Sequence, residues 1–560
     1  MRRTFIRLGL AILALCLIGS LVFADALTDR VDKLFAQWDK PDSPGCALGI
    51  IKDGRLIYKR GYGMANLEYS IPITSESVFR IGSTSKQFTA MCIALLEEER
   101  ALSLDDDIRK YIPEIPEYES SITIRHLLHH TSGIRDYLTL SSLAGARDDD
   151  FFVDEEVVEL LARQRELNFK PGEEHLYSNS GYFLLSVIVK RVTGRSLRFY
   201  AEKNIFEPLG MKHSHFHDDH TMVVKNRASG YSPQNGGGFR ISMTTLDMIG
   251  DGGIFTCVDD LLLWDKNFYH NKLGKGCREL IDRMLTTGSL NNGERLDYAL
   301  GLVIGDYRGL SMVSHGGAFV GFRAEMIRFP EQSFSVIVLA NLATINPSKL
   351  TRQLVDIYLA DAFKEKPKVP TEKPNFVKLS KTQLEEKAGA YYNKKREQIW
   401  KISLKEGILI VDASVYDFRI MPTSATHFLA IQSPQDWEIE FEKFEDDKPK
   451  LMRVTGEEGS LTFEPIQLEK PTLAELAEFL GEYFSPELQV TYKIELKDRK
   501  LFLRHENPHK DYPEKLFEAT FKDRFQVSSI GLIFFRNKRD EIVSFTMNAG
   551  RVRNIRFYKK

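Results

Sequence analysis

The 560-residue sequence predicts an α+β protein, in which an antiparallel sheet flanked by helices is followed by two small antiparallel β-barrels. Apolar runs at 47–51 and 55–58 flank Lys52-Asp53-Gly54, a typical hairpin signal because Asp and Gly tolerate the positive φ of a tight turn. A charged, proline-rich stretch at 364–374 predicts a semi-extended linker. Beyond this stretch the chain repeats itself.

Local patterns give the other elements of the first part. We expect further strands of the same sheet at 300–304, 319–329 and 334–341. Helices are expected to follow Ser83, Ile124, Asp154, Ser180 and Asp259, and a last one to run from about Ser348 to Ala362.

The C-terminal part consists of two matching stretches. Residues 400–409 match 492–501, and 388–392 match 480–484, both with an offset of 92 (492 minus 400 and 480 minus 388). Alternating strands with tight turns predict one small barrel in each repeat. Neither repeat contains a catalytic pattern.

The N-terminus predicts export from the cytoplasm. Three arginines within the first seven residues precede the apolar run 8–23, as in a secretory signal peptide, so we expect a periplasmic or secreted protein with no stable transmembrane segment after cleavage. Lipid anchoring through Cys16 is an alternative that the large Leu15 before it disfavours. The predicted organisation is a signal peptide at 1–24, a first domain at 25–362, a linker at 363–378, and barrels at 379–468 and 469–560.

Composition excludes some classes of function. A formal net charge of -2 gives no reason to expect a nucleic-acid partner. The four cysteines beyond the signal peptide are too few for a disulfide scaffold, so we expect buried thiols, with a Cys257–Cys277 bridge as the alternative.

Ser83 and Lys86 form the most informative pair. They lie where an apolar strand gives way to a helical run, and a spacing of three puts both side chains on the same side of the helix. Unpaired N–H groups and the helix dipole of the first turn favour an alkoxide there. The pair is a candidate nucleophile with its own base, provided that burial favours the neutral amine.

Two more motifs follow in the sequence, Tyr177-Ser178-Asn179 and His315-Gly316-Gly317. Together with the Ser83 motif, and in this order, they resemble the serine beta-lactamase and penicillin-binding-protein superfamily. The resemblance covers roughly residues 40–345 and implies a sheet with the terminal helices on one side, a helical subdomain on the other, and the site between them. The Gly-x-Tyr openings of the repeats resemble the lipocalin-like C-terminal domains of D-aminopeptidases in this family.

Two departures from the superfamily signature narrow the choice. Tyr177 stands where the signature has serine, which resembles the class C beta-lactamase, D,D-peptidase, D-aminopeptidase and esterase branch. His315 stands where the signature has lysine, and a mostly neutral imidazole holds a carboxylate weakly. The resemblance therefore favours a peptidase or esterase over a true beta-lactamase.

The resemblance also implies roles at the site. Ser83 would attack a carbonyl to form an acyl-enzyme, while Lys86 and Tyr177 share the proton transfers; which of them is the general base stays open. Asn179 would bind Lys86 or the substrate amide. The backbone N–H of Ala318 would be the second oxyanion donor, since the glycines before it let the strand come close.

The sequence thus predicts a serine hydrolase without a cofactor, most simply a peptidase acting on short or D-configured peptides. Its partners would be small peptide, amide or ester substrates, with cell-wall peptides among them. The alternatives are an esterase or beta-lactamase with the same site, and a non-catalytic protein that binds peptidoglycan or another ligand.

A histidine cluster offers a different chemistry. His215, His217, Asp219 and His220, with His213 upstream, resemble the zinc motif of the metallo-beta-lactamase superfamily. The segment directly follows residues 207–212, which resemble a loop of the serine family, and the further zinc ligands expected downstream are lacking. We therefore expect no metal site. His126, His129 and His130 are likewise expected to pack and cap helices.

Overall fold

The computed structural model describes residues 27–560 apart from 148–149, 235, 365–374, 395–396, 414–416, 432, 434–436, 443–450, 457–458 and 507–513. The predicted signal peptide with Cys16, and residues 365–374 of the predicted linker, lie outside the described residues. The chain forms two compact units. Among the described residues, the first unit consists of 27–138, 146–162 and 169–364, and the second of 139–145, 163–168 and 375–560.

The first unit is built on one six-stranded antiparallel sheet, which confirms the predicted sheet. The strand order is β10-β11-β12-β13-β1-β2. The strands are β1 (Cys46–Lys52), β2 (Arg55–Tyr62), β10 (Val303–Tyr307), β11 (Leu310–Phe319), β12 (Phe322–Phe329) and β13 (Phe334–Ala340). Hydrogen bonding joins β1 to β13, so the first and last strands along the chain meet in the middle of the sheet.

The expected hairpin between β1 and β2 is present. Lys52 pairs with Arg55, and the two turn residues have positive φ, 50° at Asp53 and 70° at Gly54. A tight hairpin turn of this kind requires two positive φ values, which Asp and Gly tolerate best.

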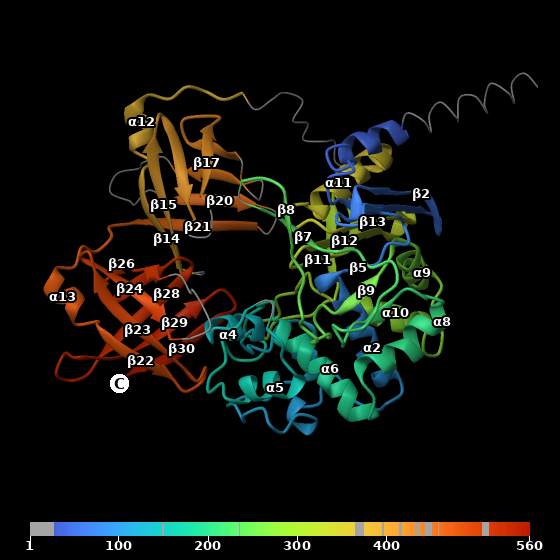
Figure 1. Ribbon diagram of the computed structural model, residues 1–560, viewed down its shortest axis with the longest axis horizontal. Coiled ribbons are helices and arrows are strands. Elements are labelled where there is room, and N and C mark those ends of the chain that lie inside the picture. Colours follow the sequence, from blue (N-terminus) through green and yellow to red (C-terminus); the bar gives the residue numbers. More distant parts are fainter. Residues whose placement is uncertain are drawn as a thin grey trace, which may run out of the picture. The chain divides into compact units, whose positions relative to one another are not determined.

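Helices cover both faces of this sheet (Figure 1). On one face, the helix over 27–35 and α11 (Pro347–Tyr358) bury apolar side chains such as Val31, Phe35 and Leu354 against the strands. On the other face lies α9 (Val258–Tyr269), whose Val258 closely approaches Gly49 of β1. A sheet that is covered on both faces buries its central strands completely, and all seven residues of β13 are buried.

The helical subdomain surrounds α2 (Lys86–Glu98), in which residues 86–96 are all buried. A helix that is buried all round has to pack against other helices on every side. Trp264 of α9 stacks on Phe88 of α2 and donates a hydrogen bond to Gln87 Oε1 (2.6 Å). This contact ties α2 to the helix that packs on the sheet.

The other helices of the first unit are η2 (Ile108–Lys110), α3 (Ile124–Leu128), α5 (Asp154–Ala162), α6 (Asn179–Thr193), α7 (Leu197–Ala201), the π-helix η3 (Glu202–Phe206), α8 (Glu207–Leu209), α10 (Arg278–Leu285), η4 (Pro330–Gln332) and η5 (Ala360–Ala362). A helix, α4 (Tyr137–Leu143), runs from the first unit into the second.

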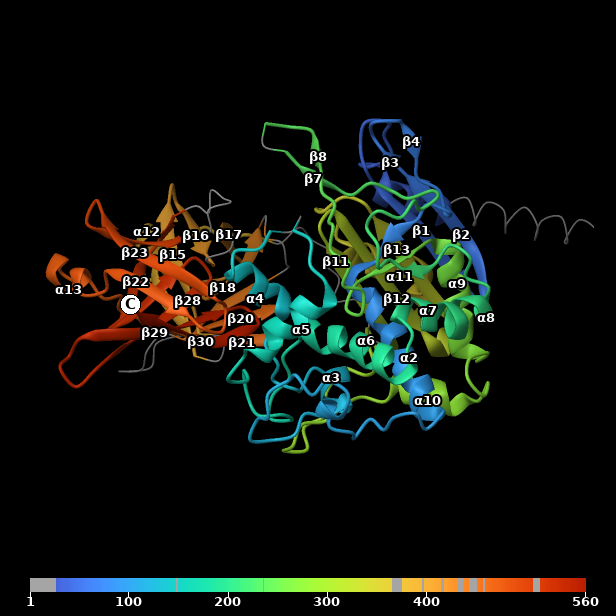
Figure 2. The same cartoon turned by 60° about the horizontal axis from the view of Figure 1, so that its bottom comes forward.

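Short strands complete the first unit. β3 (Met64–Asn66) pairs with β4 (Ile71–Pro72), and β7 (Tyr231–Pro233) with β8 (Phe239–Ile241), a ribbon that extends from the body of the unit in Figure 2. A three-stranded sheet joins β5 (Phe79–Arg80), β9 (Ile254–Thr256) and β6 (His215–Phe216). It fixes the chain immediately before Ser83.

The second unit contains two antiparallel β-structures, which confirms the predicted barrels. The first is a closed barrel of eight strands, β14–β21, and the second is a nine-stranded sheet in the order β25-β24-β23-β22-β30-β29-β28-β27-β26. The first barrel consists of β14 (Gly389–Asn393), β15 (Gln398–Lys405), β16 (Ile408–Asp412), β17 (Asp417–Pro422), β18 (His427–Ile431), β19 (Glu438–Phe441), β20 (Met452–Gly456) and β21 (Gly459–Ile466). The second consists of β22 (Gly481–Ser485), β23 (Val490–Lys497), β24 (Lys500–His505), β25 (Lys515–Leu516), β26 (Glu518–Phe521), β27 (Arg524–Val527), β28 (Ile530–Arg536), β29 (Ile542–Ala549) and β30 (Val552–Lys559).

The sequence repeat is also a structural repeat. A short helix precedes each module, α12 (Lys381–Glu385) and α13 (Leu473–Ala477), and each begins with a capping box, Ser380 with Gln383 and Thr472 with Glu475. These caps and the first strands β14 and β22 keep the offset of 92 residues seen in the sequence. The same local signals therefore start the same fold twice.

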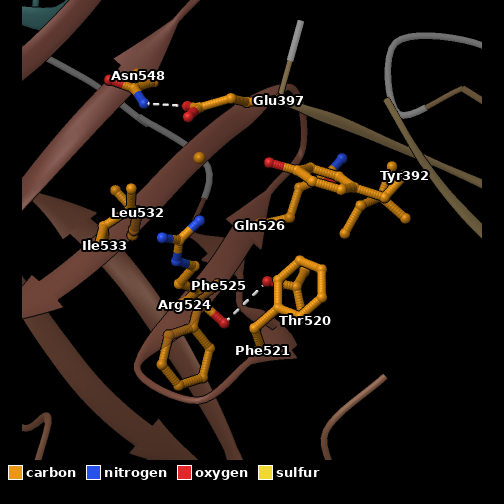
Figure 3. Close-up of a pocket in the computed structure, with 12 residues that line it drawn as sticks. Tyr392, Glu397, Thr520, Phe521, Arg524, Phe525, Gln526, Leu532, Ile533 and Asn548 are labelled. Atoms are coloured by element: carbon orange, nitrogen blue, oxygen red, sulfur yellow. Dashed lines mark hydrogen bonds between the residues drawn. The ribbon is translucent and has the colours of Figure 1, made fainter. Parts of the chain in front are cut away.

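Side chains of the two modules meet at a small hollow of about 40 Å³ (Figure 3). Tyr392 of the first module contacts Phe521 of the second edge to face, with ring centroids 5.3 Å apart. Asn548 donates a hydrogen bond to Glu397, and Lys401 forms an ion pair with Glu518. These contacts join the two modules within the second unit.

The described cysteines are free thiols. Cys46, Cys92 and Cys257 are buried, and Cys277 is partly exposed.

Among the described residues, no helix is long and apolar enough to cross a membrane.

A buried ion pair fastens α9 to the sheet. Arg328 of β12 donates from Nε to Asp265 Oδ1 of α9 (2.7 Å), and the two side chains are 3% and 1% exposed. Ser335 of β13 donates to the same oxygen (2.8 Å). Three elements are thus joined at one carboxylate.

We predict that Asp265→Ala lowers the free energy of unfolding by about 3–5 kcal/mol, because it leaves the Arg328 guanidinium buried without its counter-charge. The double variant Asp265→Leu with Arg328→Met should recover most of this loss in denaturant unfolding. Equal destabilisation by the single and double variants would contradict this account.

Candidate active site

Ser83 lies in the 3₁₀ helix η1 (Gly82–Ser85), which leads directly into α2. The turn before it depends on glycine, since Gly82 has φ +52° and a Cβ there would lie 2.9 Å from the backbone nitrogen of Ala318. Gly317 is equally restricted, because its Cβ would lie 1.9 Å from the carbonyl oxygen of Ile81. Strand β11 therefore approaches the nucleophile turn more closely than any side chain would allow.

Lys86 is completely buried, and its amine lies within hydrogen-bond distance of oxygen atoms from three other residues. Nζ lies 3.2 Å from Ser83 Oγ, 2.9 Å from Asn179 Oδ1 and 2.7 Å from the backbone oxygen of Asp251. The predicted spacing of serine and lysine thus places their reactive atoms in contact.

The identity of the other two partners determines what the amine can do. Asn179 Oδ1 and the Asp251 carbonyl are acceptors only, so they occupy two N–H bonds of Lys86. A neutral amine has only two N–H bonds, so both are used by these acceptors, and its lone pair then faces Ser83 Oγ. Burial penalises the ammonium form, so the geometry is that of a base directed at the serine hydroxyl.

The predicted Tyr177 lies over this amine. Lys86 Nζ is 4.7 Å from the centroid of the Tyr177 ring. The ring packs on His130, with centroids 4.2 Å apart, and meets Tyr298 edge to face at 6.2 Å. Aromatic neighbours thus fix the tyrosine against the lysine.

Asn179 is the first residue of α6, and a buried carboxylate holds it in place. Its backbone N–H donates to Asp136 Oδ2 (2.7 Å), which satisfies a donor of the helix N-terminus. The amide side chain is then left to accept from Lys86. Asp136 had no motif around it in the sequence, so its role could not be predicted.

The loop that presents Asp251 to Lys86 is fixed from two sides. Tyr137 donates to the Asp251 carboxylate, with 3.3 Å to each oxygen, and Arg80 Nε donates to the Gly252 carbonyl (3.1 Å). Burial raises the pKa of the Asp251 carboxyl. The sequence does not predict the role of Asp251, because it is the fold that brings its backbone carbonyl to Lys86.

His315 of β11 is held as a neutral imidazole. Its Nδ1 lies 2.6 Å from the Gly316 carbonyl, so Nδ1 donates, and Nε2 accepts from the Tyr298 hydroxyl at 3.0 Å. Burial lowers the pKa of His315 to about 4. At neutral pH this position therefore carries no cation.

The second predicted oxyanion donor follows in the same strand. Thr84 donates to the backbone oxygen of His315 (3.2 Å), which fastens β11 to η1. The Ala318 nitrogen lies beside Gly82, the residue before the nucleophile. The predicted residues of all three motifs, Ser83, Lys86, Tyr177, Asn179, His315, Gly316, Gly317 and Ala318, thus come together in the first unit.

The histidine cluster has other partners. His215 Nε2 and His217 Nδ1 lie 3.1 Å apart, Asp219 accepts from the Thr221 N–H (2.9 Å), and His220 contacts Asp247. Within the described part of the chain, no group of three or more His, Cys, Asp or Glu side chains could hold a metal ion.

Histidines near the site have structural contacts. His126 completes a capping box with Thr123 at the start of α3, and His129 Nδ1 donates to the Tyr298 carbonyl (3.1 Å). His130 Nδ1 accepts from the Ser178 N–H (3.2 Å), so it supports the loop that carries Tyr177.

We predict that the first unit loses stability as the pH falls from 6.5 to about 4. Burial lowers the pKa of both His315 and His129 to about 4, whereas an unfolded histidine has a pKa of about 6.5. Between these values the unfolded chain binds more protons, so each histidine contributes a slope of up to about 1.4 kcal/mol per pH unit. Denaturant unfolding at several pH values should show a smaller slope for His129→Asn, and an unchanged slope would contradict this assignment.

Comparison with known proteins agrees with this geometry. Residues 31–359 match the beta-lactamase family. A D-aminopeptidase of Gluconobacter oxydans (strain 621H) is 30% identical over 298 residues, which cover 53% of this chain and 56% of the relative. Penicillin-binding protein 4* of Bacillus subtilis (strain 168) is 30% identical over 303 residues, covering 51% of this chain and 66% of the relative.

The chain thus spans little more than half the length of the D-aminopeptidases it matches. Among solved structures, the octameric penicillin-binding protein homologue from Pyrococcus abyssi superimposes with a TM-score of 0.54 at 25% identity, covering 79% of this chain and 99% of the homologue. The family match extends over more than half of the 560 residues and includes all three motifs. The chain belongs to the beta-lactamase family.

Proposed function

We propose that this protein is a periplasmic or secreted serine hydrolase that cleaves amide bonds of short or D-configured peptides through an acyl-enzyme at Ser83. The observation that carries the proposal is the buried Lys86 amine, which contacts Ser83 Oγ while two acceptors occupy its other bonds. The signal peptide that the sequence predicts at residues 1–24 supports the location, and the D-aminopeptidase relatives support the substrate class.

The proposed reaction has two halves. The Ser83 hydroxyl gives its proton to the Lys86–Tyr177 pair and attacks the substrate carbonyl, and the N–H groups of Ser83 and Ala318 stabilise the oxyanion. The pair then delivers the proton to the leaving nitrogen, and the C–N bond breaks. In the second half, water gives a proton to the same pair, attacks the acyl carbonyl, and releases Ser83 with its proton.

The neutral His315 supports the choice of substrate. In the superfamily signature a lysine of this strand offers a permanent cation, which suits substrates that carry a carboxylate next to the scissile bond. Here the imidazole is uncharged and both of its nitrogens are engaged by protein groups. The site therefore favours amides without that carboxylate, such as amino acid amides and the N-terminal bonds of short peptides.

A fluorophosphonate probe should add its mass to the peptide that contains Ser83, and Ser83→Ala should abolish both labelling and turnover. Labelling of a different residue would refute the assignment. Turnover of D-amino acid amides, compared with L-amides, acyl esters and a chromogenic cephalosporin, tests the substrate class; a preference for the cephalosporin would point to a beta-lactamase instead.

Lys86→Ala and Tyr177→Phe should each lower kcat about a hundredfold or more, because each removes a group that transfers protons. Steady-state kinetics on the best amide substrate measures this effect. A matched control is Lys203→Ala on the surface of the same unit. Lys203 forms an exposed ion pair with Glu207, which includes none of the proposed site residues, so this substitution should not affect kcat.

Exhaustive chelation should leave turnover unchanged, since every proposed step uses groups of the chain. Replacing His215 and His217 by alanine should affect stability at most, because both histidine rings pack on Phe255 of the three-stranded sheet. Loss of turnover on chelation, restored by zinc, would show that the histidine cluster works in the reaction.

A further inference from the structure

The second compact unit includes two short segments that precede the barrels by more than two hundred residues, Thr139–Gly145 and Arg163–Asn168. Both flank α5, and the second leads through eight residues to Tyr177. Hydrogen bonds to the second barrel-like module hold both segments.

Glu487 is the main contact for the segment 163–168. It lies in the turn between β22 and β23 and is only 3% exposed. Its Oε1 accepts from the Arg165 N–H (2.9 Å), and its Oε2 from the Arg556 N–H of β30 (3.3 Å). One carboxylate thus joins the backbone of the segment to the backbone of the module, in bonds that solvent does not screen.

The end of the same segment is held at Asn168, which is 8% exposed. Asn168 Oδ1 accepts from the Arg553 N–H (2.8 Å), and its Nδ2 donates to the Arg551 carbonyl (2.9 Å). The side chain therefore makes the hydrogen bonds to the backbone at the start of β30 that a neighbouring strand would make. An additional ion pair joins Glu166 to Arg556 (2.8 Å).

The segment 139–145 has a contact of its own. The Tyr492 hydroxyl donates to the Leu143 carbonyl at the end of α4 (2.8 Å), and both residues are buried. The second module thus fixes the chain on either side of α5.

The sequence repeat shows that these contacts are particular to the second module. At the offset of 92 residues, Glu487 corresponds to Lys395 and Tyr492 to Trp400. Lysine cannot accept a backbone N–H, and tryptophan has no hydroxyl. Two copies of one fold therefore differ at the residues that hold the upstream segments.

We propose that the second module is a positioning element for catalysis: through Glu487 and Asn168 it fixes the start of the loop that carries Tyr177. The inference rests on the proposed function. From Asn168 the chain continues to Gly172, which donates to the Thr131 carbonyl, and to Leu176, which donates to the His130 carbonyl (3.0 Å). The loop is thus held at its start by Asn168 and further along by the Thr131 and His130 carbonyls. Releasing the start loosens the loop before Tyr177 without removing any reacting group.

Glu487→Ala tests the proposal. It should lower kcat about tenfold on the best amide substrate while KM changes less than twofold, and it should broaden or shift the limb of the pH–rate profile that belongs to the Lys86–Tyr177 pair. Glu487→Gln, which keeps one acceptor oxygen, should lose about twofold to fourfold. Glu482→Gln is the matched control, since Glu482 lies in the same module and forms only an exposed ion pair with Lys560.

Hydrogen exchange of residues 169–177 gives a readout that does not depend on activity. It should become faster in Glu487→Ala and in Asn168→Ala, and remain unchanged in the control. If the variants have a lower melting temperature but unchanged kcat and unchanged exchange in this loop, the contacts only dock the module and the proposal is wrong. If Ser83 of the unaltered protein resists the fluorophosphonate probe, the proposed function fails instead, while the exchange result still decides the positioning role.

Discussion

The site depends on one buried amine and on the three oxygen atoms around it. Ser83, Asn179 and Asp251 come from a 3₁₀ turn, a helix N-terminus and a loop, and each presents an oxygen to Lys86. A buried lysine without such partners would lower the stability of the fold, so the three oxygens that direct the amine also stabilise it. The requirement for stability and the requirement for a directed base are here the same requirement.

The packing behind this amine explains why so many elements contribute. Arg80 fixes the loop of Asp251, and Asp136 fixes the first turn of α6, so two of the partners of Lys86 each have a support of their own. The close approach of β11 to η1 needs both Gly82 and Gly317, because a Cβ at either position would overlap backbone atoms. The backbone donors of the proposed oxyanion hole are thus fixed by backbone packing, which leaves little freedom to move in a reaction.

Much of this could be predicted from the sequence because the signals are local. The Asp53-Gly54 turn, the capping boxes of the two repeats and the spacing of Ser83 and Lys86 each need only a few neighbouring residues. The roles of Asp136, Asp251 and Tyr298 depend on contacts between segments far apart in the chain, and no pattern around these residues signals them. The tautomer of His315 is a similar case, since its charge follows from a carbonyl and a hydroxyl that only the fold brings to it.

The linker and the repeats were visible in the sequence, but the assignment of residues 163–168 to the second unit was not. Those residues are mostly polar, and nothing in them indicates a partner more than three hundred residues away. A comparison of the two repeats does provide a signal. Where two modules with one fold differ, the fold itself does not require that side chain, so the side chain can have another role. Glu487 is such a position: it lies in a turn, a lysine replaces it in the other copy, and yet it is almost fully buried. The turn itself does not require this carboxylate, and its two oxygens bind the Arg165 N–H of the segment and the Arg556 N–H of β30, so its burial is explained by the contact between the segment and the module.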